Sequence, residues 1–307
     1  MRAVRLFTTG ERLQNVILDV STPGAGEISV EIRAAGICHS DAHYRAGKGR
    51  VNLPLTPGHE IAGVVEGTGQ RVALHYLLPD GRMLGKEVDG GYAERIIVPA
   101  ENAVPIPDEV SFEQAAIMMC STATAHHALN LSAMARGESV AILGFGGLGV
   151  SALQLAKIRG ASEVYAIDVV PHKLELAKAF GATPVGSGAL PAADIVLDFA
   201  GHGPTTLAAL RALKPGGRLM VVAINLRQME MDPYSDLLTK ERRIIGCADH
   251  TREELVELME LAREGRIDLS RAITRTVNLD AGEINEVLDD LDRGTSHLRT
   301  VILPIRD

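Results

Sequence analysis

The first 120 residues alternate short apolar runs with glycine and proline residues. Strand-like runs occupy residues 28–37, 60–67, 71–77 and 95–98. Short runs that are separated by turn residues are typical of β-strands in a small barrel. The segment 111–129 then changes to a helical pattern, and Ser111 with Gln114 fits a capping box at its start. The pattern predicts a β-rich region that ends in a helix.

The pattern changes after Gly137, where apolar strands alternate with helices. Strands are expected at residues 139–143, 162–170, 194–201, 217–225 and 242–249. Helices are expected after the glycine turn at 144–149 and at 171–181, 205–213, 251–265 and 282–294, with a last strand at 299–305. Buried strands that alternate with helices predict a parallel sheet covered by helices, which is an α/β fold.

Composition and charge restrict the functional classes. The chain has 307 residues, which favours two domains, and 46% of them are hydrophobic. Its net charge is −8 and no basic cluster is present, which argues against nucleic acid as a partner. No apolar run approaches the roughly 18 residues of a membrane helix, and the first residues lack the apolar core of a signal peptide. We therefore expect a cytoplasmic protein with no membrane partner.

Two short segments concentrate residues with metal-binding side chains. Residues 36–43 read GICHSDAH and residues 58–60 read GHE, so Cys38 and His59 offer a thiolate and an imidazole. Zn²⁺ prefers these ligand types. The chain has only three cysteines, too few and too widely spaced for a disulfide framework. Cys120 is the candidate third ligand and Cys247 its rival, although the strand around Cys247 makes it a core residue in our interpretation.

The same segments contain groups that can orient a ligand or move a proton. Ser40 and His43 provide a hydroxyl and an imidazole for a short proton path. Asp41 is the candidate that would orient the ligand histidine through its second ring nitrogen. Glu60 follows His59 directly, and it is either a fourth ligand or a charge just outside the ligand set.

A dinucleotide-binding fingerprint occupies residues 144–149. It reads GFGGLG, and Gly144, Gly146 and Gly149 match G-x-G-x-x-G, with Gly147 and Leu148 between them. The hexamer follows a predicted strand and opens a predicted helix, as dinucleotide binding requires. The helix N-terminus can then bind a pyrophosphate through its N–H groups.

Asp168 indicates which dinucleotide is bound. It ends the next predicted strand, about 20 residues after the fingerprint, where a carboxylate bonds the adenosine ribose. A carboxylate repels a 2′-phosphate, and no arginine follows Asp168 directly. We therefore expect NAD(H) rather than NADP(H).

Together these motifs resemble the zinc-dependent alcohol dehydrogenases of the medium-chain dehydrogenase/reductase superfamily. The family's pattern G-H-E-x₂-G-x₅-G-x₂-V is matched by Gly58, His59, Glu60, Gly63, Gly69 and Val72. The resemblance covers essentially the whole chain. It implies a GroES-like catalytic domain at residues 1–121 plus 265–307 and a Rossmann NAD-binding domain at residues 122–264.

The resemblance also implies roles for individual residues. Cys38, His59 and Cys120 match the ligands of one catalytic zinc ion, and Cys120 favours the alcohol branch over the polyol branch. Ser40 and His43 match the proton relay. His39 and Arg299 match groups that contact the cofactor pyrophosphate, and Lys173 matches a lysine that contacts ribose. The implied reaction is reversible hydride transfer between a small alcohol and NAD⁺ that gives an aldehyde or ketone.

The chain departs from the family pattern in one stretch. Many relatives carry four closely spaced cysteines that bind a second, structural zinc, but residues 71–94 contain no cysteine. We expect no structural zinc, and the resemblance implies a homo-oligomer, either a dimer or a tetramer. The alternatives are a zinc polyol or amino-alcohol dehydrogenase, a zinc-free protein like the quinone reductases, and a non-catalytic binding protein.

Overall fold

A computed structural model describes residues 1–186, 190–224, 228–294 and 297–304. The chain forms two compact units, Met1–Ser121 with Thr251–Asp307 and Thr122–His250. We call them, after the roles that the family resemblance implies, the catalytic unit and the nucleotide unit. Asn225 and Ile305, where two predicted strands end, lie outside the described residues. Among the described helices, none is both long and apolar enough to cross a membrane.

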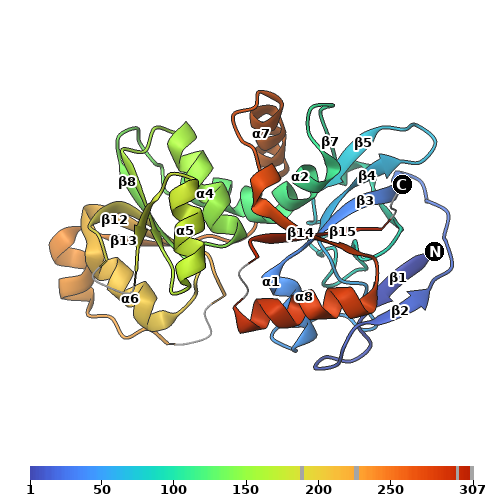
Figure 1. Cartoon of the computed structure of the whole chain (residues 1–307), viewed down its shortest axis with the longest axis horizontal. Coiled ribbons are helices and arrows are strands. Elements are labelled where there is room, and N and C mark those ends of the chain that lie inside the picture. Colours follow the sequence, from blue (N-terminus) through green and yellow to red (C-terminus); the bar gives the residue numbers. More distant parts are fainter. Residues whose placement is uncertain (187–189, 225–227, 295–296, 305–307) are drawn as a thin grey trace. The chain divides into compact units, whose positions relative to one another are not determined.

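The catalytic unit is built on a seven-stranded sheet in the order β14-β15-β3-β4-β5-β7, with β6 also paired to β3 (Figure 1). Its strands are β3 (Glu27–Ile37), β4 (Glu60–Val65), β5 (Arg71–Leu74), β6 (Arg95–Pro99), β7 (Ala103–Pro105), β14 (Ile273–Asn278) and β15 (Arg299–Leu303). β1 (Arg2–Arg5) and β2 (Gln14–Ile17) form a separate antiparallel pair. Buried aliphatic side chains such as Val30, Ile32 and Ile61 form the core of this unit.

Four helices complete the catalytic unit. They are α1 (His39–Arg45), α2 (Phe112–Ile117), α7 (Arg252–Arg263) and α8 (Ala281–Arg293). Ser111 caps α2 by accepting a hydrogen bond from the Gln114 N–H, as the sequence predicts. The sequence analysis missed α1, because a seven-residue helix gives almost no periodic signal. α1 lies against α8 (Figure 1).

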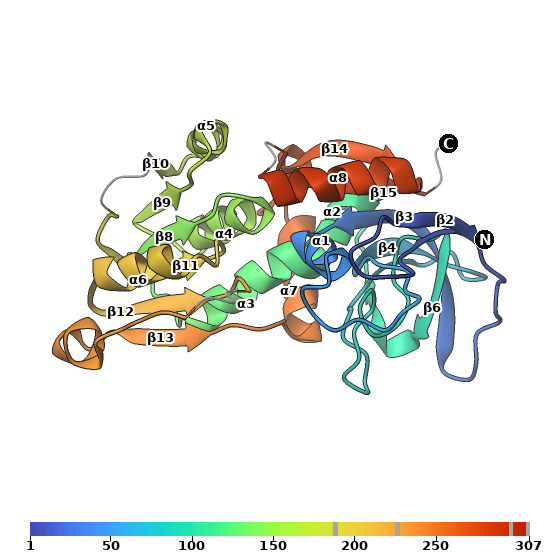
Figure 2. The ribbon, with the colours of Figure 1, turned by 90° about the horizontal axis from the view of Figure 1, so that it is seen from below.

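The nucleotide unit is a six-stranded parallel sheet in the order β10-β9-β8-β11-β12-β13 (Figure 2). Its strands are β8 (Ser139–Leu143), β9 (Glu163–Ile167), β10 (Thr183–Val185), β11 (Ala193–Asp198), β12 (Leu213–Val221) and β13 (Arg243–Gly246). Its helices are α3 (Ala123–Leu131), α4 (Gly147–Ile158), α5 (Pro171–Ala179) and α6 (Gly203–Ala212). This is the predicted α/β architecture of a Rossmann domain.

The division of the chain differs from the expected one at residues 251–264. The family resemblance implied that they belong to the Rossmann NAD-binding domain. In the structure α7 packs against β7, and Arg252 donates hydrogen bonds to the carbonyl oxygens of Glu101 and Ala103. Residues 251–264 therefore belong to the catalytic unit.

Candidate metal centre and nucleotide site

Cys38 lies at the junction between β3 and α1. It is the N-cap residue of α1, and its N–H donates to Asp41 Oδ2 at 2.9 Å, which is half of a capping box. The side chain of Cys38 is 8% exposed. The short helix thus turns the chain sharply after β3 and fixes the thiol in a buried position.

His59 and Glu60 lie at the start of β4, where glycines make room for their side chains. Gly36 is the partner of Glu60 in the β3–β4 ladder, and a Cβ on Gly36 would lie 1.8 Å from Glu60 Oε2. Only glycine leaves space for this carboxylate. Gly58 has φ +95°, a conformation that favours glycine, and its missing Cβ leaves room for the Tyr92 ring.

Cys120 comes from a distant part of the chain. It lies in a π-helical turn, Met118–Thr122, that follows α2. Single π-turns within helices are frequent at functional sites. The Sγ atoms of Cys38 and Cys120 lie 4.0 Å apart although the residues are 82 positions apart in sequence.

Cys38, His59, Glu60 and Cys120 form one cluster in which a ligand atom of each lies within 4.8 Å of the others. Two sulfur atoms at about 2.3 Å from a tetrahedral zinc ion lie about 3.8 Å apart, close to the observed separation. Glu60 Oε1 is buried and has no hydrogen-bond partner among the described residues. The donor set and the unpartnered oxygen fit a zinc ion.

Cys247, the rival third ligand, is not part of this cluster. It follows β13 in the nucleotide unit, is 7% exposed, and its Sγ lies 4.0 Å from the carbonyl oxygen of Thr124. Its position agrees with the prediction that it is a core residue.

The two cysteine thiols of the cluster shift each other's pKa values. The neighbouring Cys120 thiol, together with His59 and against the effect of burial, holds the pKa of Cys38 well below its usual value. The same contact with Cys38 and burial raise the pKa of Cys120. The thiolate is the form of cysteine that binds zinc, and the lowered pKa of Cys38 favours this form.

Asp41 lies next to His59, the candidate ligand histidine. Its Oδ1 is 3.3 Å from His59 Nδ1, and its side chain has no exposed surface. Although burial lowers it, the nearby charge of Asp41 raises the pKa of His59 well above its usual value. With Nδ1 directed at Asp41, Nε2 is the nitrogen left for a metal. The hydroxyl of Tyr92, which the sequence analysis missed, donates to Asp41 Oδ2 at 2.8 Å.

Arg299 has a partner that the sequence did not suggest. Its guanidinium donates a hydrogen bond to Glu60 Oε2, and its side chain is 5% exposed. Burial raises the pKa of Glu60 to about 7, although the charge of Arg299 opposes that rise. In this structure Arg299 thus lies beside the candidate metal cluster and pairs with its member Glu60. Its expected contact with a pyrophosphate stays a prediction.

The candidate proton path starts beside the cluster on α1. Ser40 Oγ is buried and has no hydrogen-bond partner among the described residues, so it is available to a bound molecule. The rings of His43 and His39 are 4.5 Å apart, and His39 Nε2 lies 3.8 Å from Asp292 Oδ1 on α8. Burial, His39 and Lys48 lower the pKa of His43, against the opposing charges of Asp292 and Cys38.

The fingerprint glycines open α4 in the nucleotide unit. Gly144 has φ +87° and Gly146 is the N-cap residue of α4, which contains Gly147, Leu148 and Gly149. A Cβ on Gly149 would lie 2.9 Å from the carbonyl oxygen of Gly144. The turn therefore needs glycine at both ends, and its backbone is open to a pyrophosphate at the helix N-terminus.

Asp168 follows β9 and lines a cavity of about 620 Å³ together with Gly144, His202 and Thr205. Its carboxylate accepts the N–H groups of Phe145 and Val170 at 2.8 and 2.9 Å, which ties it to the glycine turn. Lys173 Nζ lies 3.9 Å from the same carboxylate. The cavity has the size and the carboxylate that an adenosine group requires. The sequence analysis missed His202 and Thr205, which carry no motif.

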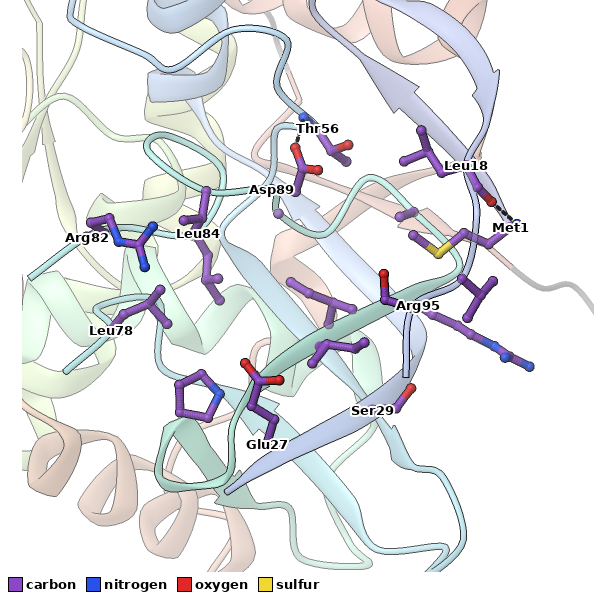
Figure 3. A pocket seen from close by; sticks show the side chains of 18 of the residues that line it. Met1, Leu18, Glu27, Ser29, Thr56, Leu78, Arg82, Leu84, Asp89 and Arg95 are labelled. Carbon is purple, nitrogen blue, oxygen red and sulfur yellow. Dashed lines mark hydrogen bonds between the residues drawn. The ribbon is translucent and has the colours of Figure 1, made fainter. Parts of the chain in front are cut away.

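A second cavity, of about 600 Å³, lies in the catalytic unit apart from the metal cluster (Figure 3). Thr56, Leu78, Asp89 and Arg95 are among its lining residues, and no member of the metal cluster lines it. Two pairs of its charged groups form ion pairs, Arg5 with Asp89 and Arg82 with Asp80. This cavity therefore offers no evident chemistry.

Two family models match the chain. The model described as alcohol dehydrogenase GroES-like domain matches residues 24–108, and the one described as zinc-binding dehydrogenase matches residues 147–264. These matches cover Cys38, His59 and Glu60 in the first case and Asp168 and Lys173 in the second.

Individual relatives extend the similarity over almost the whole chain. An alcohol dehydrogenase from Geobacillus stearothermophilus is 34% identical, over 90% of this chain and 92% of the relative. The structure of acetophenone reductase from Geotrichum candidum in complex with NAD has a TM-score of 0.89 and 27% identity, covering 98% and 97% of the two chains. A zinc-binding dehydrogenase from Sinorhizobium meliloti bound to NADP has a TM-score of 0.87 and 27% identity, covering 99% of each chain.

Proposed function

This chain belongs to the zinc-binding alcohol dehydrogenase family, and on that premise we propose that it is an NAD-dependent alcohol dehydrogenase with a single catalytic zinc ion. The chain is a zinc-type oxidoreductase that interconverts alcohols and carbonyl compounds with a nicotinamide cofactor. The proposal concerns the finer points: the ligand set, the number of zinc ions, the preference for NAD and the proton path.

One observation carries the proposal, namely the convergence of Cys38, His59, Glu60 and Cys120 within 4.8 Å. Two sulfurs and an imidazole are the ligands of a catalytic zinc site that keeps a position for substrate. We assign Cys38, His59 and Cys120 as ligands. Glu60 is the fourth donor when no substrate is present, and Arg299 is the alternative partner that can hold its carboxylate.

A bound zinc ion would supply Lewis acidity toward the substrate oxygen, and the nicotinamide would accept the hydride. The chain's own residues do the rest. Asp41 holds His59 through Nδ1, so that the imidazole presents Nε2 in a fixed orientation. Gly36 and Gly58 leave the space that Glu60 and the His59 segment need.

The proton that an alcohol loses needs an acceptor on the catalytic unit. The unpartnered hydroxyl of Ser40 lies on α1, one turn before His43. We propose that the Ser40 hydroxyl accepts this proton as it gives up its own, and that the neutral His43 ring takes up the released proton and passes it to solvent. Because the pKa of His43 is lowered, its ring stays neutral, and thus able to accept a proton, to a lower pH than that of an ordinary histidine.

Asp168 supports the preference for NAD. Its carboxylate is held by two backbone N–H groups and lines the 620 Å³ cavity, where a 2′-phosphate would meet its negative charge. In this proposal Gly144–Gly149 bind the pyrophosphate and Lys173 contacts the ribose, while the contacts of His39 and Arg299 with the cofactor stay predictions from the family resemblance.

The proposal also covers zinc stoichiometry and assembly. A structural zinc of the four-cysteine type has no ligands here, since the chain has three cysteines and none in residues 71–94. We propose one zinc per chain, a homo-oligomer that is a dimer or tetramer, and a cytoplasmic location. We also propose a catalytic domain and an NAD-binding domain that correspond to the two compact units.

A cofactor and substrate panel tests the function. The zinc-loaded enzyme is assayed with NAD⁺ and NADP⁺ against primary, secondary and cyclic alcohols and a set of polyols. We expect a higher kcat/KM with NAD⁺ and with simple alcohols. Equal kcat/KM for the two cofactors contradicts the NAD preference, and activity confined to polyols contradicts the assignment to simple alcohols.

A further inference from the structure

We propose that Tyr92 is a positioning residue of the metal centre, which holds Asp41 and through it the ligand His59. This inference rests on the proposed zinc chemistry. Tyr92 is not one of the proposed zinc ligands. It lies in the segment between β5 and β6, away from all the motifs that identify the family in the sequence.

The contact between Tyr92 and Asp41 is fully buried. Tyr92 is 0% exposed and Asp41 is 1% exposed. Asp41 Oδ2 accepts the Tyr92 hydroxyl at 2.8 Å and the Cys38 N–H at 2.9 Å, while Oδ1 faces His59 Nδ1 at 3.3 Å. One carboxylate thus joins Tyr92 to two of the proposed zinc ligands.

The backbone fixes Tyr92 against the segment that carries His59. The Tyr92 N–H donates to the Pro57 carbonyl oxygen at 3.0 Å, and the Tyr92 carbonyl accepts the Val4 N–H at 2.8 Å. A Cβ on Gly58 would lie 2.4 Å from the Tyr92 ring, so the ring occupies the space that this glycine leaves. The position of the hydroxyl is therefore set by the same residues that precede His59.

The physical reason for such a residue is the cost of a buried carboxylate. An ionised carboxylate without water needs hydrogen-bond donors, and leaving one acceptor site unsatisfied is costly. The Tyr92 hydroxyl is one of three groups that face Asp41. Burial and the charge of Asp41 raise the pKa of Tyr92 well above its usual value, so the hydroxyl remains a donor. Without it, we expect Asp41 to turn away from His59 and the imidazole to lose its orientation.

Removing the hydroxyl while keeping the ring tests this inference. Loss of an outer partner of a metal ligand costs about 10–100-fold in metal affinity, and Tyr92 acts one step further out. We therefore expect Tyr92→Phe to weaken zinc affinity about tenfold in competition with a chelator. The Co²⁺-substituted enzyme should show altered d–d absorption bands. Tyr165→Phe, which removes the same atom from β9 in the nucleotide unit, should leave both measurements unchanged.

A double-mutant cycle with Asp41→Asn separates positioning from packing. If Tyr92 acts through Asp41, Tyr92→Phe has almost no further effect on zinc affinity in the Asp41→Asn protein. Equal losses in both backgrounds, or an unchanged affinity and cobalt spectrum in folded Tyr92→Phe, would overturn the inference. A role in stability alone lowers the melting temperatures of the zinc-free and zinc-loaded forms equally, whereas positioning reduces the increase that zinc produces.

The same measurements distinguish this inference from the proposed function. If the unsubstituted protein binds no zinc, the proposed function fails. If it binds zinc as proposed and Tyr92→Phe binds it equally well, the inference about Tyr92 fails alone.

Discussion

The metal cluster collects its donors from three separate places in the catalytic unit, whereas the glycine turn of the nucleotide unit is one continuous segment. Cys38 follows β3, His59 and Glu60 begin β4, and Cys120 lies in a π-turn beyond α2. Residues 144–149 need only the strand before them and the helix after them. The metal centre therefore depends on long-range packing, while the turn depends mainly on local backbone conformation.

This difference predicts that damage to one site leaves the other intact. The two sites lie in different compact units, each with its own hydrophobic core. Substitutions in the cluster should abolish zinc binding and spare NAD binding, and substitutions at Asp168 should weaken NAD binding and spare zinc binding.

The largest effect is expected for Cys38→Ala or His59→Ala. Each removes a proposed zinc ligand and with it several kcal/mol of charge stabilisation, so kcat should fall by about 10³-fold or more. Metal analysis should find no zinc, and NADH fluorescence should show unchanged binding. A variant that loses NADH binding together with zinc would break the proposed independence of the two sites.

Ser40→Ala should have the next largest effect. Loss of a group that transfers a proton costs about 10²-fold or more in turnover, while Ser40 holds neither zinc nor the dinucleotide. Single-turnover kinetics should show the fall, with normal zinc content and NADH affinity as controls. Full activity in Ser40→Ala would refute the relay.

Asp168→Ala should shift cofactor use with little change in the metal centre. Hydrogen bonds to a charged group contribute about 1.5–3 kcal/mol, so kcat/KM for NAD⁺ should fall about 10–100-fold. The value for NADP⁺ should fall less or rise, because the repelling charge is gone. If both cofactors lose equally, Asp168 supports the glycine turn and does not select the cofactor.

His43→Gln should have the smallest effect, and one that depends on pH. The neutral ring of His43 accepts protons above its lowered pKa, while solvent bases become abundant only at high pH. We expect alcohol oxidation to slow about tenfold near pH 7, and the difference from the unsubstituted enzyme to vanish near pH 9. If the ratio of the His43→Gln rate to the unsubstituted rate stays constant between about pH 7 and pH 9, His43 takes no part in the proton transfer.

The glycine turn and Asp168 were easier to predict from the sequence than the metal cluster was. The strand, glycine turn, helix and Asp168 could be predicted because they lie within one continuous segment, residues 139–168, and follow one periodic pattern. The helix at residues 111–129 was also predictable, but it is divided by the π-turn that contains Cys120. No local pattern shows such a turn.

The metal centre was predictable only in part. The residue types at 38, 59 and 60 indicated zinc, and Cys120 was a candidate third ligand that the family resemblance then supported, because only the folded chain brings Cys120 to Cys38. The Arg299–Glu60 and Tyr92–Asp41 contacts span 239 and 51 residues and carry no sequence signal. Long-range contacts between buried polar groups are set by the packing of the sheet, which periodicity does not describe.

The most direct test of the account is a titration of activity against zinc content. Zinc is removed stepwise with a chelator and restored, and zinc per chain is measured alongside NAD⁺-dependent alcohol oxidation on the same samples. The account predicts that activity rises linearly and is complete at one zinc per chain. Two zinc ions per chain in the fully active enzyme, or full activity in the zinc-free protein, would contradict it.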